Sequence, residues 1–380
     1  MPSFTSRIVT AVAISSLGLL AACSPSTGGD ASASSDSATV RFGVSGPVTG
    51  PSAEYGAYWK EGFDLALQEI NADGGVDGKQ VELVWEDSQS DPKQSVPIAQ
   101  KFVADDSIIA ELGDFSSPAS MAASATYQQA GMVQFGFTNS AAGFTQGGDH
   151  MWSSILTQAY YQTLGADLVK NYADSISVVY LQSDWGKSSF DAFKAEADRI
   201  GLNIVYESPI APDSEDYRPV LIKARDAAPD AIVHIGYAPD GARVIRQLRE
   251  LGWTSQFFGG QATPQFLEAA GDAAEGTIIN ENLLIGNDAP AVVAFNEKFR
   301  ETYGHDPSVF SVYAYDALNI VAEAAEEGGA TREGVFNALN SGEPFDSVQF
   351  GEFTFGEDRR PNDVPLLPLI VKNGAYEKLA

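Results

Sequence analysis

Segments with strand character and segments with helix character alternate along most of this 380-residue chain. The alternation starts with a strand pattern at Val40–Ser45 and a helix pattern at Glu54–Ala72, where the apolar residues recur at helical spacing. A strand–helix–strand unit forms a right-handed crossover, which makes the two strands parallel and covers one face of their sheet. The sequence therefore predicts an α/β fold with parallel sheets.

The same alternation continues into the second half of the chain. The first half has further strand patterns at Val81–Trp85, Ile108–Leu112 and Val133–Phe135, and helix patterns at Lys93–Ala104 and Pro118–Ala130. In the second half, strands are expected at Val178–Leu181, Ile204–Tyr206, Ala231–Ile235 and Phe257–Phe258, and helices at 186–200, 217–226, 240–251 and 264–270. The roughly 340 residues from Val40 onward are too many to pack around one small hydrophobic core, so two doubly wound lobes are predicted.

The first 22 residues have the pattern of an export signal. Arg7 precedes an apolar run from Ile8 to Leu20, and the run is too short for a transmembrane helix. Leu20-Ala21-Ala22-Cys23 has the form of a lipoprotein cleavage site, so Cys23, the single cysteine, is the expected lipidation site. An ordinary secretory signal with an incidental cysteine is the alternative. Residues 23–39 are rich in Ser, Gly, Ala and Asp, which predicts a disordered tether.

An excess of acidic residues limits the partners of the chain. The sequence has 23 Lys and Arg against 51 Asp and Glu, and removal of Arg7 with the signal brings the net charge to about −29. Such a surface repels nucleic acid and anionic headgroups. No nucleic-acid partner is therefore expected, and contact with the membrane is expected through the lipid anchor only.

Sequence patterns of enzymes are missing. No GxSxG, GxGxxG or HExxH motif occurs. Gly186-Lys187-Ser188 resembles the end of a P-loop, but Leu181 stands where the first glycine is required. His150, His234 and His305 are scattered along the chain. No metal, cofactor or catalytic residue is expected, and the chain is predicted to be a binding protein.

Hydroxyl side chains gather at two successive turns, after the strands at 108–112 and 133–135. Ser117 before Pro118 is interpreted as an N-cap followed by a favoured first helical residue. A helix N-terminus with a hydroxyl beside it can hold a carboxylate. The alternative is that Ser117 only caps its own helix, but the second turn favours a binding site. The hydroxyl residues of the two turns are Ser116, Ser117 and Ser120, and Thr138 and Ser140.

Aromatic residues occur at the ends of several expected strands. Tyr55 begins a helix after a loop rich in turn-forming residues, and Trp185 and Tyr237 directly follow strands. Ligands of doubly wound sheets bind beyond the carboxyl ends of the strands, so these rings are expected to face a cleft between the lobes. Packing within a loop is the alternative for each. One residue of the pair Tyr160 and Tyr161 is also expected to face the cleft.

Four longer motifs resemble those of bacterial solute-binding lipoproteins in the branched-chain amino acid (Leu/Ile/Val-binding) family of ABC importers. They are Gly46-Pro47-Val48-Thr49-Gly50-Pro51 with Tyr55-Gly56, and residues 69–78 (EINADGGVDG), 87–93 (DSQSDPK) and 271–276 (GDAAEG). The resemblance extends from Val40 to the C-terminus. It implies a type I periplasmic-binding-protein fold whose lobes, 40–155 with 282–358 and 156–281 with 359–380, are joined by a hinge of three crossings.

The resemblance also implies a ligand site. Ser117 and Ser140 would hold a carboxylate, helped by main-chain groups around Thr138. Tyr55 would wall the pocket from the first lobe, and Phe310 matches a family aromatic near the side chain of the ligand. Trp185, together with Tyr237 or its neighbour, would cover the pocket from the second lobe.

Gln261 departs from the pattern of this family. Amino-acid binders of the family have an acidic residue after the Phe-x-Gly strand that pairs with the ligand ammonium, but here the segment is Phe258-Gly259-Gly260-Gln261. Loss of one charged hydrogen bond weakens binding by roughly 1.5–3 kcal/mol, or about 10- to 150-fold. Either Asp184 or Asp240 replaces the missing acid, or the ligand has no α-ammonium. Urea, short amides, and aromatic or aliphatic carboxylates then remain open.

The expected function is that of an extracytoplasmic, lipid-anchored receptor. It would capture an amino acid, branched-chain or related, or another small carboxylate and deliver it to the permease subunits of an ABC importer. An amide, urea or aromatic-acid binder of the same family is one alternative. A regulatory subunit that senses a ligand with the same two lobes is another.

Overall fold

The computed structural model describes residues 39–212, 214–283, 285–362, 364 and 366–379. The predicted signal peptide, Cys23 and the tether up to residue 38 lie outside the described residues. Thr39, expected in the tether, begins the first strand, where it pairs with Gln80. Within the described part of the chain, no helix combines the length and apolar character that a membrane crossing requires.

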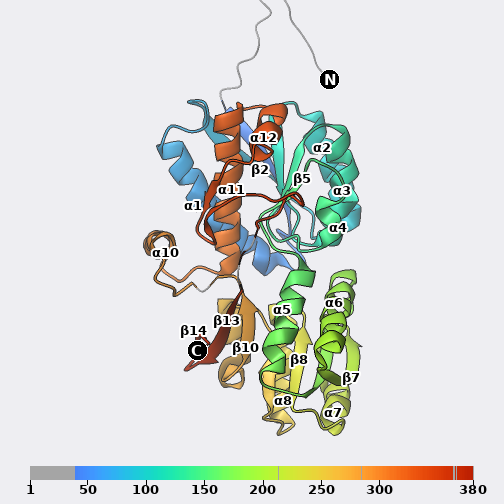
Figure 1. Cartoon of the computed structure of the whole chain (residues 1–380). Coiled ribbons are helices and arrows are strands. Elements are labelled where there is room, and N and C mark those ends of the chain that lie inside the picture. The colour runs from blue at the N-terminus through green and yellow to red at the C-terminus, as the bar shows by residue number, and fades with distance from the viewer. Residues whose placement is uncertain (1–38, 213, 284, 363, 365, 380) are drawn as a thin grey trace, which may run out of the picture. The chain divides into compact units, whose positions relative to one another are not determined.

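The first sheet has the strand order β2-β1-β3-β4-β5, and all of its strands are parallel. Helix α11 packs along α1 (Figure 1), and α12 packs against α11. The strands are β1 (Thr39–Gly46), β2 (Gln80–Asp87), β3 (Ile108–Gly113), β4 (Val133–Gly136) and β5 (Met151–Ser153). The helices are α1 (Ala53–Ala72), α2 (Pro92–Ala104), α3 (Ser117–Gln129), α4 (Ala142–Thr145), α10 (Pro290–Tyr303), α11 (Val309–Gly328) and α12 (Arg332–Leu339). A separate hairpin consists of β11 (Phe345–Ser347) and β12 (Gly351–Phe353).

The second sheet has the order β14-β13-β10-β9-β8-β6-β7. Its strands are β6 (Ser175–Leu181), β7 (Asn203–Ile210), β8 (Ala231–Ile235), β9 (Gln256–Phe258), β10 (Ile278–Glu281), β13 (Leu367–Lys372) and β14 (Ala375–Lys378). The helices of this half are α5 (Gln158–Lys170), α6 (Asp184–Ile200), α7 (Arg218–Asp226), α8 (Ala238–Glu250), α9 (Pro264–Ala270) and the 3-10 helix η1 (Gly271–Ala274). Helix α5 packs against α6 (Figure 1).

The predicted α/β fold with parallel sheets is confirmed, except at one edge of the second sheet. There β13 runs antiparallel to β10, and β14 antiparallel to β13. The two strands are joined at Asn373-Gly374, whose φ angles of 51° and 74° suit a two-residue hairpin turn. Arg360, expected in the second lobe, donates hydrogen bonds to Ser153 and Ile155 beside β5.

The apolar stripe predicted for α1 forms part of the largest hydrophobic core. Trp59 and Phe63 are fully buried, and both rings contact Phe137, which follows β4. Gly62 lets α11 approach closely, because a Cβ at this position would lie 2.0 Å from the carbonyl oxygen of Ser311. This packing holds the turn after β4 in place.

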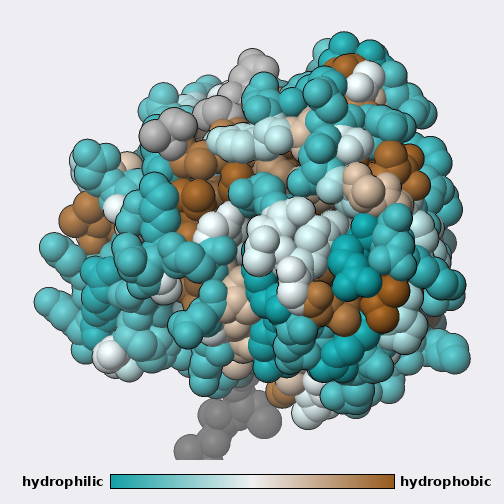
Figure 2. Space-filling model, turned by 90° about the horizontal axis from the view of Figure 1, so that it is seen from below, coloured by the Kyte–Doolittle hydropathy of each residue, from teal (hydrophilic) through white to brown (hydrophobic). Residues whose placement is uncertain are grey.

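Hydrophilic residues cover most of the face shown in Figure 2, and the hydrophobic residues on it form separate groups. Large apolar side chains that are exposed on the described surface, such as Val205 and Ile222, belong to different elements. This distribution agrees with the acidic composition of the chain.

Candidate functional site

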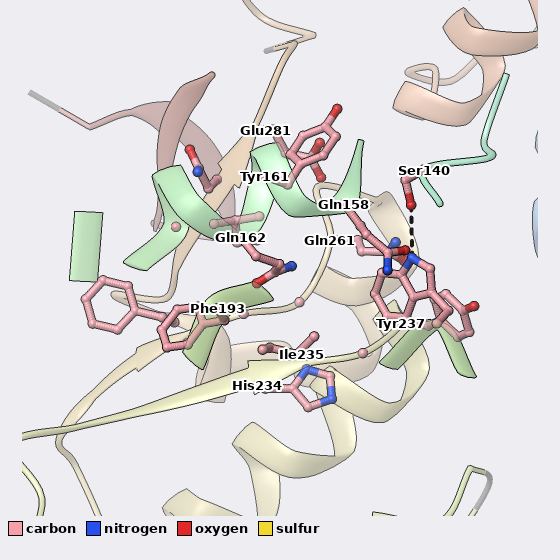
Figure 3. Close-up of a pocket in the computed structure, with 18 of the residues that line it drawn as sticks. Ser140, Gln158, Tyr161, Gln162, Phe193, His234, Ile235, Tyr237, Gln261 and Glu281 are labelled. Carbon is pink, nitrogen blue, oxygen red and sulfur yellow. Dashed lines mark hydrogen bonds between the residues drawn. The ribbon is translucent and has the colours of Figure 1, made fainter. Parts of the chain in front are cut away.

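A cavity of about 210 Å³ lies where turns after strands of both sheets meet. This volume is below the usual range for ligand pockets, which is about 300–1,000 Å³. Turns after β3 and β4 line it from the first sheet, and turns after β6, β8 and β9 line it from the second. Figure 3 shows ten labelled lining residues. Of the eight ligand-binding candidates, seven line this cavity: Ser117, Thr138, Ser140, Trp185, Tyr237, Gln261 and Phe310.

The interpretation of Ser117 as the N-cap of α3 is wrong by one residue. Ser116 is the cap, and its hydroxyl accepts a hydrogen bond from the amide of Ala119 at 3.4 Å. Ser117 is the first helical residue, and its hydroxyl accepts a hydrogen bond from the amide of Ala141 at 3.2 Å. The hydroxyl proton of Ser117 is therefore not needed by its own helix and can be donated to a ligand.

Hydrogen bonds fix the two hydroxyl-rich turns to each other. Asn139 donates from Nδ2 to the carbonyl oxygen of Asp114 at 2.9 Å and to the Ser120 hydroxyl at 2.7 Å. Thr138 donates from Oγ1 to the carbonyl oxygen of Phe115 at 3.0 Å. Because Thr138 uses its hydroxyl proton within the scaffold, its side chain positions the turn rather than offering a donor to the cavity.

A hydrogen bond of Trp185 joins the second-sheet side of the cavity to the hydroxyl-rich turns of the first. The indole Nε1 of Trp185, at the start of α6, donates to the Ser140 hydroxyl at 3.0 Å (Figure 3, dashed line). The Trp185 ring stacks on Tyr237, with ring centroids 5.1 Å apart and planes at 21°. Trp185 and Tyr237 thus form an aromatic wall that faces the hydroxyl-rich turns.

Tyr55 lies one layer behind the cavity, although it was expected to wall it. It is 1% exposed and stacks on Phe115 at 4.3 Å, and Phe115 is the ring that lines the cavity. Its hydroxyl donates to Oε1 of Gln261 at 2.7 Å, and the amide of Ala238 donates to the same oxygen at 3.1 Å. These two donors orient the Gln261 side chain. The backbone N–H of Ala238 can only donate, so the atom that it contacts must be the side-chain oxygen of Gln261. The oxygen of the neutral Gln261 amide thus accepts two hydrogen bonds, one for each lone pair.

The turn that carries Gln261 requires glycine. Gly260 has φ of +88°, and a Cβ at this position would lie 2.5 Å from the Phe266 ring. Gly259 has φ of +142°, and a Cβ there would lie 2.5 Å from the carbonyl oxygen of His234. The backbone between β9 and α9 can therefore pass close to β8.

Of the two tyrosines at the start of α5, Tyr161 lines the cavity and Tyr160 does not. Tyr160 is 39% exposed, and its hydroxyl donates to the carbonyl oxygen of Val364. Phe310, at the start of α11, packs edge-on against Tyr55 at 4.8 Å.

Polar residues of the lining that were not among the predicted site residues include Gln158, Gln162, His234, Asn280 and Glu281. Gln158 is 7% exposed, and its Oε1 has no partner among the described residues; the same is true of Nδ2 of Asn280. These polar residues sit on α5, β8 and β10, and no motif singled them out.

Burial shifts the pKa values of several ionisable side chains that line the cavity. It lowers the pKa of His234 to about 3, so this imidazole is neutral at physiological pH. It raises the pKa of Glu281 to about 7, and the amide of Ala262 partly offsets this effect by a hydrogen bond. Burial also raises the pKa of Tyr161 and Tyr237 well above the phenol value. Within the described ranges, no cluster of His, Cys, Asp and Glu has the arrangement of a metal site.

A family model described as periplasmic binding protein matches residues 39–366. A "Leu/Ile/Val-binding protein homolog 1" from Brucella melitensis is 28% identical over 334 residues, which are 85% of this chain and 88% of that protein.

Two solved structures share the fold, each with a TM-score of 0.82 and 90% of this chain covered. One is the branched-chain amino acid transporter substrate binding protein LivJ from Streptococcus pneumoniae in complex with isoleucine, 24% identical and covered completely. The other is a solute binding protein of an ABC transporter from R. palustris in complex with benzoate, 18% identical and 96% covered.

Proposed function

Because the chain belongs to the periplasmic binding protein family, we propose that it is the solute-binding component of an ABC importer, which captures an amino acid or another small carboxylate outside the cytoplasm. The observation that carries the proposal is the cavity between turns of the two sheets, with hydroxyls on one side and an aromatic wall on the other. The names of the Brucella relative and of the isoleucine complex agree with an amino acid as the solute.

The hydroxyls of Ser117 and Ser140 are the proposed carboxylate ligands. Each accepts a hydrogen bond from a protein N–H, from Ala141 and Trp185 respectively. An accepted hydrogen bond leaves the hydroxyl proton available and strengthens it as a donor to an anion. The first turn of α3 adds backbone N–H groups and the positive end of its dipole.

The two sheets, each with its helices, are proposed to be lobes that close on the solute. The chain passes between them after β5, after β10 and after β12, in line with a hinge of three crossings. The bond between Trp185 and Ser140 would form on closure, because Ser140 follows a strand of the first sheet and Trp185 follows a strand of the second. Release to the permease would require that this bond opens.

The aromatic lining also fits an aromatic acid as the solute. Phe115, Tyr237 and Phe310 line the cavity together with Trp185. The benzoate complex from R. palustris has the same fold. A benzoate-type acid is therefore the second candidate, and the serine hydroxyls would hold its carboxylate in the same way.

Anchoring through Cys23 and delivery to permease subunits complete the proposal; catalysis is not part of it.

The test is a binding titration with the double variant Ser117→Ala, Ser140→Ala. Amino acids and aromatic acids would first be screened by their effect on the melting temperature of the wild-type protein. Since a hydrogen bond to a charged group contributes about 1.5–3 kcal/mol, we expect the double variant to bind the best carboxylate at least 100-fold more weakly. Ser208→Ala, Ser341→Ala removes two hydroxyls away from the cavity and should bind like wild type. Full affinity in the Ser117, Ser140 variant would refute the assignment.

A further inference from the structure

One carboxylate faces the cavity without a cation to balance it. Glu281 is the last residue of β10, and among the described lining residues it is the sole Asp or Glu, while none is Lys or Arg. Its Oε1 accepts a hydrogen bond from the amide of Ala262 at 3.3 Å. Figure 3 shows Glu281 beside Tyr161, with Ser140 further to the right.

Most groups around Glu281 are phenols. Tyr161, Tyr313 and Tyr376 feel the charge of Glu281, and burial raises the pKa of each, so they are neutral near pH 7. Two charged groups act on these phenols: Arg360 acts on Tyr161, and Asp316, whose pKa burial raises to about 6, acts on Tyr313. The Arg360 guanidinium donates to Ser153, to Ile155 and to the carbonyl oxygen of Ala141. An ionised carboxylate in such surroundings is costly until a proton or a cation joins it.

A second acceptor belongs to a residue of the same lining. The side-chain nitrogen of Gln158 donates to the hydroxyl of Ser188, which leaves Oε1 of Gln158 without a partner among the described residues. This oxygen is buried, and the Gln158 side chain that carries it lines the cavity. A buried acceptor of this kind is stabilised by a donor that the ligand brings.

We propose that Glu281, together with Oε1 of Gln158, binds the ammonium group of the solute while the Ser117 and Ser140 hydroxyls hold its carboxylate. The inference rests on the proposed function and narrows its substrate class to zwitterions. A solute with a carboxylate alone would bring a second negative charge next to Glu281 or require that Glu281 stay protonated. A zwitterion can pair its carboxylate with the serine hydroxyls and its ammonium with Glu281 at once.

The two acids considered from the sequence as replacements do not line the cavity. Asp240 is buried, and its Oδ1 accepts a hydrogen bond from the Tyr217 hydroxyl at 2.7 Å. Asp184 is exposed at the start of α6. Neither carboxylate is therefore assigned to the ammonium, and Glu281 on β10 takes that role.

The assignment makes binding depend on pH in one direction. Burial raises the pKa of Glu281 to about 7, and a bound ammonium would lower this pKa, so the ionised form binds. Affinity for a zwitterion is then full above pH 7 and falls as the carboxyl gains a proton below it. Between pH 8.5 and pH 5.5 the loss is about thirtyfold. His234, with a pKa of about 3, and the lining tyrosines do not titrate in this window.

The experiment compares matched pairs of solutes: L-leucine with 4-methylpentanoate, and L-phenylalanine with 3-phenylpropanoate. Calorimetric titration of the wild-type protein should show at least tenfold tighter binding of one or both amino acids than of the deaminated partner. Glu281→Gln keeps the shape of the side chain, and it should lose this preference and the pH dependence. Asp184→Asn removes a carboxylate outside the lining and should change neither.

The outcomes separate this inference from the proposed function. If deaminated acids bind as well as amino acids, or if neither amino acid binds, Glu281 has no ammonium to hold and the inference falls. It also falls if Glu281→Gln keeps the preference. Should the variant fail to fold, the solute preference and pH profile of the wild type decide alone. In each case the proposed function stands as long as a carboxylate binds and the Ser117, Ser140 variant loses it.

Discussion

Replacing Trp185 with phenylalanine isolates the one hydrogen bond that joins the aromatic wall to the hydroxyl-rich turns. The change removes the indole N–H that donates to Ser140 at 3.0 Å and keeps an aromatic ring to stack on Tyr237. If this bond forms only when the lobes close, its loss weakens the closed, ligand-bound state and leaves the open state unchanged. The variant thus tests closure without removing a ligand of the solute carboxylate.

The expected size follows from the type of bond. A neutral hydrogen bond contributes a net 0.5–1.5 kcal/mol or so, which corresponds to roughly two- to twelvefold in affinity. Calorimetric titration with the best solute measures this change. At a solute concentration that does not saturate the protein, the radius of gyration measured by scattering should be larger for the variant than for wild type. The reason is that a smaller fraction of the variant is closed.

Trp253→Phe is a matched control for Trp185→Phe. Its indole N–H also donates to a serine hydroxyl, that of Ser255 at 2.7 Å, but Trp253 follows α8 and does not line the cavity. The control variant can lose stability but should keep its affinity. If Trp185→Phe binds like wild type, or if both variants lose affinity equally, then the bond between Trp185 and Ser140 does not report closure.

Two further predictions concern groups behind the cavity. Tyr55→Phe removes the donor to Oε1 of Gln261, a bond that also joins the two sides of the cavity, so by the same reasoning it should weaken affinity by roughly two- to twelvefold in calorimetric titrations, the loss of a neutral hydrogen bond of about 0.5–1.5 kcal/mol; an affinity equal to that of wild type would show that this bond does not stabilise the closed state. Burial raises the pKa of Glu111 to about 8, above its unfolded value, so this group favours the folded state at low pH and loses that contribution as pH rises toward 8. Glu111→Gln should therefore raise the melting temperature, relative to wild type, more at pH 8.5 than at pH 5.5, and a gain that is equal at both pH values would show that Glu111 is ionised in the folded protein.

Much of the fold was predictable because strand and helix periods differ and glycine and proline mark the turns. The strands before the hydroxyl-rich turns lie where the sequence predicted them, and the rule that ligands bind beyond strand ends brought Ser117 and Ser140 to one cavity. The C-terminal hairpin was missed, although Asn373-Gly374 is a typical signal for a two-residue turn.

Side-chain roles were harder to predict, because a shift of one residue changes what a side chain does. With the cap at Ser116 instead of Ser117, the second hydroxyl is released from the helix and faces the cavity. Tyr55 occupies the layer behind Phe115 because α1 packs tightly on the first loop. Local sequence does not encode such layering.

Glu281 was overlooked for a different reason. The tyrosines that interact with its charge, Tyr161 and Tyr313, are distant in the sequence, and the segment Ile278-Ile279-Asn280-Glu281 carries no motif. The sequence showed that an acid was missing at Gln261 but not where another acid would come from. The candidate role of Glu281 can be recognised only from the way in which α5, β10 and α11 come together in the fold.

The most direct measurement is a crystal structure of the protein with the solute that binds best. We predict its carboxylate within about 2.5–3.2 Å of the Ser117 and Ser140 hydroxyls, with Trp185 and Tyr237 packed over its body. Solute density outside this cavity, or a carboxylate that faces away from both serines, would contradict the central claim.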